Sequence, residues 1–370
     1  MDNKKLKLSR ITIKGYKSFS NACPVDIDLS NITVLLGANG SGKSNLISFF
    51  KMLNFMMSGS FQNYIELNGT ADTFLHYGAK RTKHISGELY FENLINTDLY
   101  SFTLSHATPD RLIITSEEIE WLRKGESNRK KISMETNFKE SSLYKTNGVI
   151  EKIIWNVLSR CRVFQFHDTS AESFLRKPSH IAASDYLLSE GGNLSAFLWN
   201  MRQESKNHYD RIVSYIQVVM PQFGDFLLEP NSNGFVMLKW KDNSANDYIL
   251  LPQQISDGSL RFIALATLLL QTPEKMPTVI ILDEPELGLH PLAIVQLAEM
   301  IKQASEHAQI ILATQSPRLV DEFDASDIVV MEREDNYSIC KRLDTIELKD
   351  WLDSYTVSEL WDKNVIGGRP

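Results

Sequence analysis

One short segment carries residues whose types and spacing suit the binding of a polyphosphate. Residues 37–44 read GANGSGKS, which fits the pattern G-x-x-x-x-G-K-[ST]. In this pattern the glycines let backbone N–H groups surround phosphate oxygens, the lysine reaches the terminal phosphates, and the last hydroxyl binds Mg²⁺. We therefore expect ATP and Mg²⁺ as cofactors, with Lys43 also acting in catalysis and Ser44 as a metal ligand. The residues expected to contact the nucleotide are Gly37, Asn39, Gly40, Ser41, Gly42, Lys43, Ser44 and Asn45.

A second segment places two carboxylates at the end of an apolar run. Residues 279–284 read VIILDE, which predicts a buried strand with two acids at its tip. We expect an ionised Asp283 to bind the metal and Glu284 to act as general base or to position the attacking water. An acidic turn before Pro285 is the ordinary interpretation of such a pair on its own. The phosphate loop in the same chain favours the catalytic interpretation.

The strand and the helix that a phosphate loop requires on its two sides are both predicted from the hydrophobic pattern. Residues 32–36 form an apolar run typical of a buried strand, and the apolar residues after the loop recur at helical spacing until Gly59. Two half-buried antiparallel strands are expected before it, around residues 6–13 and 25–29. This part of the chain is therefore a β-region followed by a strand, loop and helix unit.

The remaining sequence first predicts antiparallel strands and later alternates strands with helices. We expect an antiparallel β-region over 84–121, a polar stretch over 123–147, helices from about 148 and over 193–220, strands over 278–282, 310–313 and 328–331, and a helix over 292–305. This order indicates an α/β protein.

Composition excludes several other classes. The chain has 370 residues, 43% of them hydrophobic, with a net charge of −7 and three cysteines that form no CxxC pair. These values exclude a disordered chain and a disulfide scaffold. The longest predominantly apolar run, 262–270, is far shorter than the ~20 residues of a membrane span. We expect no membrane association, and without a recognisable secretion signal we expect a cytoplasmic protein.

A third motif resembles the signature of the ABC ATPase superfamily. Ser256-Asp257-Gly258-Ser259 precedes an apolar-faced helix, one element before the acidic strand. The resemblance implies a head-to-tail homodimer with two sandwiched ATP molecules, in which Ser256, Gly258 and Ser259 contact the nucleotide held by the other subunit. A simple helix cap is the alternative interpretation of these four residues.

Two further segments agree with this superfamily. Residues 286–291 are similar to its D-loop, and Gln315 stands at the switch position, where most members have histidine. Glutamine can donate a hydrogen bond but cannot become cationic, so we expect Gln315 to act in a slow or partner-stimulated ATP hydrolysis. His290 could be catalytic, although its place beside a proline at a helix start favours a structural role.

The Q-loop of the superfamily, which carries a glutamine, has a candidate in residues 165–170, QFHDTS. Gln165 follows an apolar run and precedes a helical segment, so we expect it to contact both the nucleotide and Mg²⁺. His167 is the second choice, and a polar strand end is the alternative for the whole segment.

The opening segment 11–19, ITIKGYKSF, resembles the first strands of RecF, SMC and OLD-like ATPases, and the chain is most similar to the predicted AAA-type ATPases of the ABC class found in bacterial anti-phage modules. Residues 360–370 resemble the closing segment of that group. The implied fold is an α/β ABC-type P-loop ATPase head with an antiparallel β-subdomain and a helical lobe, and with no long coiled coil. We expect a single head over 1–370: an N-terminal β-region with the phosphate loop over 1–60, an inserted β and helical lobe over 61–255, the signature, acidic strand, D-loop and switch over 256–335, and a helical tail over 336–370.

The resemblance implies a dimeric ATPase that senses a trigger and regulates an effector in antiviral defence. Too few residues follow Met331 for a Toprim nuclease domain, so we expect the effector to be a neighbour-encoded Toprim-like or HNH nuclease, or a toxin. The alternative is a RecF-like ATPase that binds DNA in repair or recombination. The basic residues within 123–131 could contact nucleic acid, although such runs are usually solvated loops. A transporter ATPase is disfavoured by the opening strands.

Overall fold

The computed structural model describes residues 6–126, 128–136, 139–244 and 248–369. The chain divides into two compact units, the first made of residues 1–162 and 324–370 and the second of residues 163–323. The phosphate loop belongs to the first unit, whereas the signature, the acidic strand and the switch belong to the second. The division also passes through the predicted inserted lobe 61–255, between residues 162 and 163.

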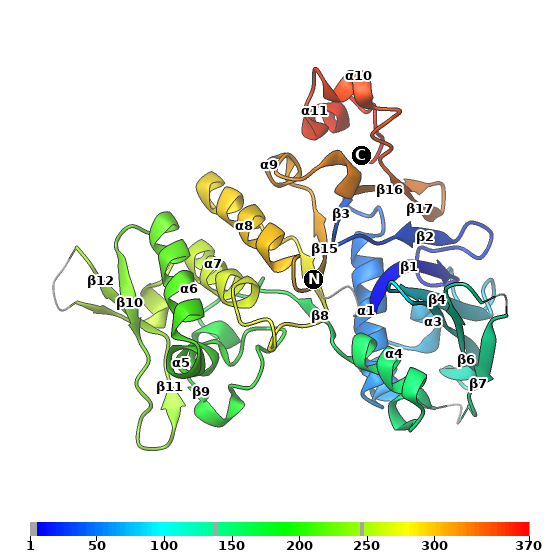
Figure 1. Cartoon of the computed structure of the whole chain (residues 1–370), viewed down its shortest axis with the longest axis horizontal. Helices are drawn as coiled ribbons and strands as arrows, with labels where there is room; N and C mark the ends of the chain where they lie inside the picture. Colours follow the sequence, from blue (N-terminus) through cyan, green and yellow to red (C-terminus); the bar gives the residue numbers. More distant parts are fainter. Residues whose placement is uncertain (1–5, 127, 137–138, 245–247, 370) are drawn as a thin grey trace. The chain divides into compact units, whose positions relative to one another are not determined.

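The first unit contains an antiparallel sheet with the strand order β2-β1-β4-β5-β6-β7; Figure 1 labels β1, β2, β4, β6 and β7 of this sheet. The predicted antiparallel strands are confirmed, and β7 lies in the predicted polar stretch 123–147, for which no strand is expected. The strands are β1 (Lys7–Lys14), β2 (Val25–Asp28), β4 (His84–Glu92), β5 (Asn96–Ala107), β6 (Arg111–Arg123) and β7 (Lys130–Ser133). None of the four residues of β7 is fully buried, so its sequence shows no alternation of apolar and polar residues that would predict a strand. Pairing with β6 defines β7 instead.

The phosphate loop connects β3 (Ile32–Leu36) to α1 (Lys43–Met57), as predicted. All five residues of β3 are buried, and β3 pairs in parallel with β16 (Ile328–Glu334), which continues into antiparallel β17 (Tyr337–Arg342). The predicted helical tail therefore begins with a strand. The rest of the first unit consists of α2 (Phe61–Asn68), α3 (Ala71–Phe74), α4 (Val149–Ser159), α10 (Lys349–Leu352), α11 (Val357–Asp362) and the single turns η1 (Leu143–Lys145) and η5 (Ala325–Asp327).

Aromatic side chains attach α1 to the sheet. The ring of Phe49 on α1 stacks on Phe102 of β5 with 6.0 Å between centroids and meets Tyr16 edge-on at 5.3 Å. These side chains are almost fully buried. A side chain at Gly87 would collide with Phe49 and Phe102, so this glycine on β4 lets the helix approach the strands closely. This packing fixes the position of α1 on the antiparallel sheet, and with it the end of the phosphate loop that leads into the helix.

The second unit contains two parallel strands and a group of helices that contact one another. The strands β14 (Val279–Asp283) and β15 (Gln309–Thr314) pair in register, and α6, α7 and α8 contact one another, side by side in Figure 1. The helices are α5 (Leu194–Glu204), α6 (Lys206–Val219), α7 (Asp257–Leu269), α8 (Pro291–Ala304) and α9 (Pro317–Val320). These bounds confirm the strands and helices predicted for this region.

Short elements complete the second unit. Strand β8 (Cys161–Phe164) contains the point at which the chain enters it. The others are β9 (Ser179–His180), β10 (Phe223–Leu227), β11 (Phe235–Val236), β12 (Lys239–Asp242), β13 (Ile249–Leu250), η2 (Phe174–Arg176), η3 (Ile181–Ala183) and η4 (Pro252–Gln254). Among the described residues, the longest helix is α1 with 15 residues, and no helix is both long and apolar enough to cross a membrane.

Candidate functional site

The phosphate loop turns tightly because its glycines allow backbone conformations that other residues avoid. Gly40 and Gly42 have φ angles of 81° and 112°. A Cβ atom at Gly37 would lie 2.3 Å from the carbonyl oxygen of Met331, so the loop begins in direct contact with β16. Among the described residues, no side chain caps the N-terminus of α1, and its first turn contains no acidic residue. This helix end suits an anion such as a phosphate group.

The side chain of Lys43 folds over the loop that precedes it. Its Nζ atom donates to the carbonyl oxygens of Gly37 at 2.5 Å and Ala38 at 3.0 Å, and the residue is 6% exposed. Ser44 is exposed, whereas the amide of Asn45 donates to Ser18 Oγ at 2.7 Å. Lys43 is thus held close to the loop at which a terminal phosphate would bind.

The acidic strand end and the predicted Q-loop meet in the second unit. Gln165 Nε2 donates to Asp283 Oδ2 at 2.7 Å, and His167 Nε2 donates to the backbone carbonyl of Asp283 at 2.8 Å. The structure therefore brings together two of the three residues predicted to bind Mg²⁺, Gln165 and Asp283. His167, the second choice at this position, contacts the same residue through its backbone.

The predicted general base contacts the predicted switch residue. Gln315 Nε2 donates to Glu284 Oε1 at 2.5 Å, and the backbone N–H of Glu284 donates to Ala313 O at 2.9 Å. Glu284 has a φ of 42°, a left-handed conformation that is uncommon for a side chain of this size. Such conformations are often found at functional sites, where the surrounding contacts maintain them.

A carboxylate that the sequence analysis did not single out supports the switch. Glu286 accepts hydrogen bonds from the hydroxyl of Thr314 and from the backbone N–H of Gln315. Thr314 Oγ1 in turn accepts from Ser316 N at 2.9 Å. Burial raises the pKa of Glu286 above its ordinary value. The D-loop therefore positions the backbone on each side of Gln315.

The predicted signature forms the start of α7. Ser256 Oγ accepts from Ser259 N at 3.2 Å, so Ser256 is the N-cap of the helix and is itself exposed. A Cβ atom at Gly258 would lie 2.5 Å from Gly288 O, which explains why a glycine faces the D-loop here. The helix-cap interpretation is confirmed, and contact with a nucleotide stays a prediction.

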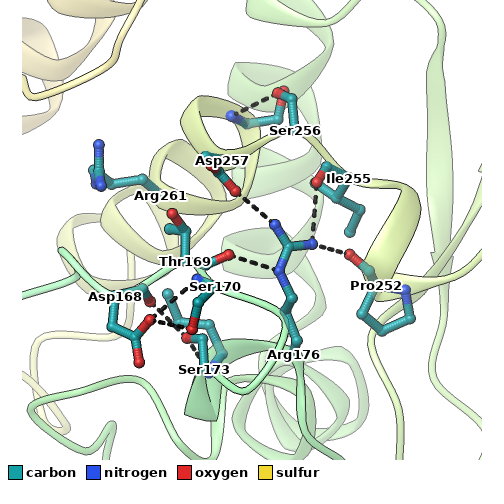
Figure 2. A network of polar contacts seen from close by, with 12 residues as sticks. Asp168, Thr169, Ser170, Ser173, Arg176, Pro252, Ile255, Ser256, Asp257 and Arg261 are labelled. Atoms are coloured by element: carbon teal, nitrogen blue, oxygen red, sulfur yellow. Dashed lines mark hydrogen bonds and ion pairs between the residues drawn. The ribbon is translucent and has the colours of Figure 1, made fainter.

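A buried arginine connects the segment after Gln165 to the signature (Figure 2). Arg176 is 6% exposed, and its guanidinium donates to Thr169 O at 2.8 Å, to Ile255 O at 3.0 Å and to Pro252 O. It also forms an ion pair of 2.8 Å with Asp257, the first residue of α7. Sequence reasoning missed Arg176 because nothing in its neighbourhood indicates burial.

A second buried arginine connects α7 to the Q-loop segment and the D-loop. Arg261 donates to Phe166 O at 2.9 Å, to His167 O at 3.1 Å and to Leu287 O. It is also 6% exposed, and burial lowers the pKa of its guanidinium. A charged residue within the apolar sequence of α7 was the available signal for this role.

Two alternatives from the sequence receive structural evidence. His290 Nδ1 accepts from Leu292 N at 3.3 Å and so caps α8, which favours the structural interpretation of this histidine. In the basic segment, Lys124, Arg129 and Lys131 form ion pairs with Glu92, Glu120 and Glu118 respectively. These pairs reduce the positive charge that the segment could offer to a phosphate backbone.

The fold is that of an ABC-type ATPase head. A crystal structure of an SMC head bound to the C-winged helix domain of ScpA aligns with 93% of this chain and 99% of its own, with a TM-score of 0.61 and 17% identity. An SMC head domain with an extended coiled coil from Pyrococcus furiosus, bound to the C-terminal domain of ScpA, aligns with 94% of this chain and 99% of its own, with a TM-score of 0.58 and 15% identity. The predicted fold class is confirmed.

The chain belongs to the AAA domain family, because the model of that family matches residues 10–216, more than half of its length. A second family model, described as "AAA domain, putative AbiEii toxin, Type IV TA system", matches residues 161–321. Structural maintenance of chromosomes protein 3 of Saccharomyces cerevisiae is 38% identical over 56 residues, which are 15% of this chain and 4% of the yeast protein. The chain therefore matches a small part of that relative.

Removing the Arg176 guanidinium should destabilise the second unit. We expect Arg176→Met to lower the free energy of unfolding by about 2–4 kcal/mol, since three buried carbonyl groups lose a charged donor. Urea denaturation measures this change. The matched control is Arg318→Met, whose side chain is 58% exposed and should change stability by less than about 0.5 kcal/mol. Equal effects of the two substitutions would contradict the structural role of Arg176.

Proposed function

We propose that this ATPase head binds ATP with Mg²⁺, dimerises around two nucleotides, hydrolyses them slowly and thereby controls a separately encoded effector. The observation that carries the catalytic part is the pair of hydrogen bonds at the end of β14, from Gln165 to Asp283 and from Gln315 to Glu284. Each carboxylate has its own neutral amide partner, so the two acids can have separate roles. We assign Lys43 and Ser44 of the phosphate loop to the same nucleotide, as the sequence predicts.

The donor set fits a magnesium ion. Mg²⁺ usually binds one or two carboxylates and keeps several water or phosphate oxygens as ligands. The proposed ligands Asp283, Ser44 and Gln165 would provide one carboxylate, one hydroxyl and one amide, and no cluster of three or more ionisable metal ligands is found among the described residues. When bound, the ion would neutralise charge on the phosphates. Gln165 would then have to turn its amide oxygen toward the metal.

Glu284 is the residue proposed to act on water. Its carboxylate would accept a proton from the attacking water while Lys43 stabilises the negative charge of the phosphates. The neutral amide of Gln315 donates to one oxygen of Glu284, and we assign the other oxygen to the attacking water. Because glutamine cannot become cationic, it stabilises developing phosphate charge less than a protonated histidine would. We therefore propose slow or partner-stimulated turnover.

The regulatory part of the proposal is supported by the family comparison. The model whose description includes a toxin and a type IV toxin–antitoxin system covers the signature, the acidic strand, the D-loop and the switch residue Gln315. A chain of this kind would control a neighbour-encoded nuclease or toxin in anti-phage defence. A RecF-like role on DNA is the second candidate, and the short match to a chromosome-maintenance protein favours it.

Two substitutions separate nucleotide binding from hydrolysis. We expect Lys43→Ala to weaken ATP binding at least about 100-fold, because the loop loses its one positive charge on the phosphates. We expect Glu284→Gln to bind ATP normally and to lower kcat by about 100-fold or more, since the proton acceptor is lost. Titration of a fluorescent ATP analogue and phosphate release measure these effects. Unchanged phosphate release by Glu284→Gln would refute the assignment of the base.

The dimer interface is tested by a matched pair of variants at Ser256. Aspartate and asparagine both cap helices about as well as serine, so Ser256→Asp and Ser256→Asn should fold equally well. In the Glu284→Gln background we expect Ser256→Asn to retain ATP-dependent dimerisation and Ser256→Asp to lose it, because a carboxylate would face the γ-phosphate. Light scattering after gel filtration measures the mass. Equal dimerisation of both variants would show that Ser256 contacts no nucleotide.

The partner is tested by purification of the Glu284→Gln chain expressed with its genomic neighbours in ATP and Mg²⁺. We expect a neighbour-encoded protein to be retained in stoichiometric amount, and to be lost in the Lys43→Ala variant. Retention of nucleic acid alone, released by salt, would favour the RecF-like role instead.

A further inference from the structure

Residues 367–369 contact the first turn of the phosphate loop. The backbone N–H of Ala38, the second residue of the loop, donates to the carbonyl oxygen of Gly368 at 2.9 Å. The carbonyl oxygen of the same Ala38 accepts from Ser41 N at 3.2 Å and from Lys43 Nζ at 3.0 Å. The peptide groups of Ala38 therefore connect residue 368 to the lysine of the loop.

This contact requires glycine at residues 367 and 368. Their φ angles are 78° and 77°, which side chains strongly disfavour. A Cβ atom at Gly368 would lie 2.5 Å from Val330 Cγ1 and 3.7 Å from the Cα atom of Gly37. Backbone conformation and close packing thus both restrict this position to glycine.

Two polar contacts hold the glycine pair in place. Glu332 on β16 accepts from Gly368 N at 2.6 Å, and a Cβ atom at Gly367 would lie 2.8 Å from the same carboxylate oxygen. Arg369 donates to Asp362 O, at the end of α11, at 2.6 Å. The segment is therefore anchored on both sides of the peptide that contacts Ala38.

We propose that Gly368 and Glu332 are positioning residues for the phosphate loop. They hold the Ala38 peptide in the orientation in which its carbonyl oxygen accepts from Lys43. A loop that is already ordered loses less conformational entropy when phosphate binds, so this anchor strengthens ATP binding. The part of the proposal that concerns ATP rests on the proposed function, whereas the contact itself does not.

The contact is tested without nucleotide, by amide hydrogen exchange of the peptide that contains residues 36–44. Gly368→Ala and Glu332→Ala should each accelerate exchange in this peptide, because the hydrogen bond of Ala38 opens more often. Glu332→Gln keeps a hydrogen-bond acceptor and should restore protection. The matched control is Gly125→Ala: Gly125 has a φ of 97° with no atom within 4 Å of its Cβ position, so its substitution introduces similar backbone strain far along the sequence from the loop. Unchanged exchange in both Gly368→Ala and Glu332→Ala would overturn the proposal.

The consequence for ATP is tested by steady-state kinetics. We expect Gly368→Ala and Glu332→Ala to raise KM for ATP about three- to tenfold, the effect of one hydrogen bond, with kcat changed less than twofold. If the two residues only stabilised the fold, their substitution would reduce the fraction of folded protein, so the apparent kcat would fall while KM stayed unchanged. That result would overturn the proposal. If neither the unmodified chain nor the Lys43→Ala variant binds ATP, the proposed function fails. Hydrogen exchange, which needs no nucleotide, still decides whether Gly368 holds the loop.

Discussion

The second unit depends on guanidinium groups that satisfy the backbone of loops. In this unit the predicted catalytic residues Glu284 and Gln315 each follow the end of a strand, in segments where many backbone carbonyl groups have no partner within a regular element. Arg176 and Arg261 are buried, and together they donate to six backbone carbonyl groups, from the Q-loop segment to the D-loop; one of them, Pro252 O, also accepts from Ile255 N. Arginine suits this role because its planar group presents five donors and remains charged when it is buried.

The two arginines connect the segments around the carboxylates Asp283 and Glu284 to the signature. Arg261, which belongs to the helix that begins at the signature, donates to the carbonyl groups of two residues after Gln165 and to that of Leu287 in the D-loop after Asp283. Arg176 holds the turn before that helix and pairs with Asp257. Displacement of the Q-loop segment would therefore strain the N-terminus of α7. The D-loop takes part as well, because Gly258 leaves space for its backbone and Glu286 orients the residues beside Gln315.

In the first unit, the position of the phosphate loop depends on backbone groups that approach one another closely. Gly37 lies against β16, and Gly368 lies against Gly37 and Val330. A side chain at either glycine would separate the loop from the strand that supports it. The N-terminus of α1 attracts phosphate by its dipole, yet the direction of its N–H groups depends on how the loop enters the helix. The glycines and the aromatic contacts of Phe49 together determine that entry.

The sequence by itself determined the elements and the chemistry that local patterns encode. The strand 32–36, the helix after the loop and the strand that ends at Asp283 follow from apolar runs and spacing, and the structure has them with nearly the same bounds. The strands β7 and β17 escaped prediction because few of their residues are buried, so that pairing with β6 and β16, not hydrophobicity, makes them strands. Only the tertiary structure decided which polar groups meet. The partners of Arg176, of Glu286 and of Gly368 are distant in sequence, and hydrogen bonds over such separations leave no periodic signal in the chain.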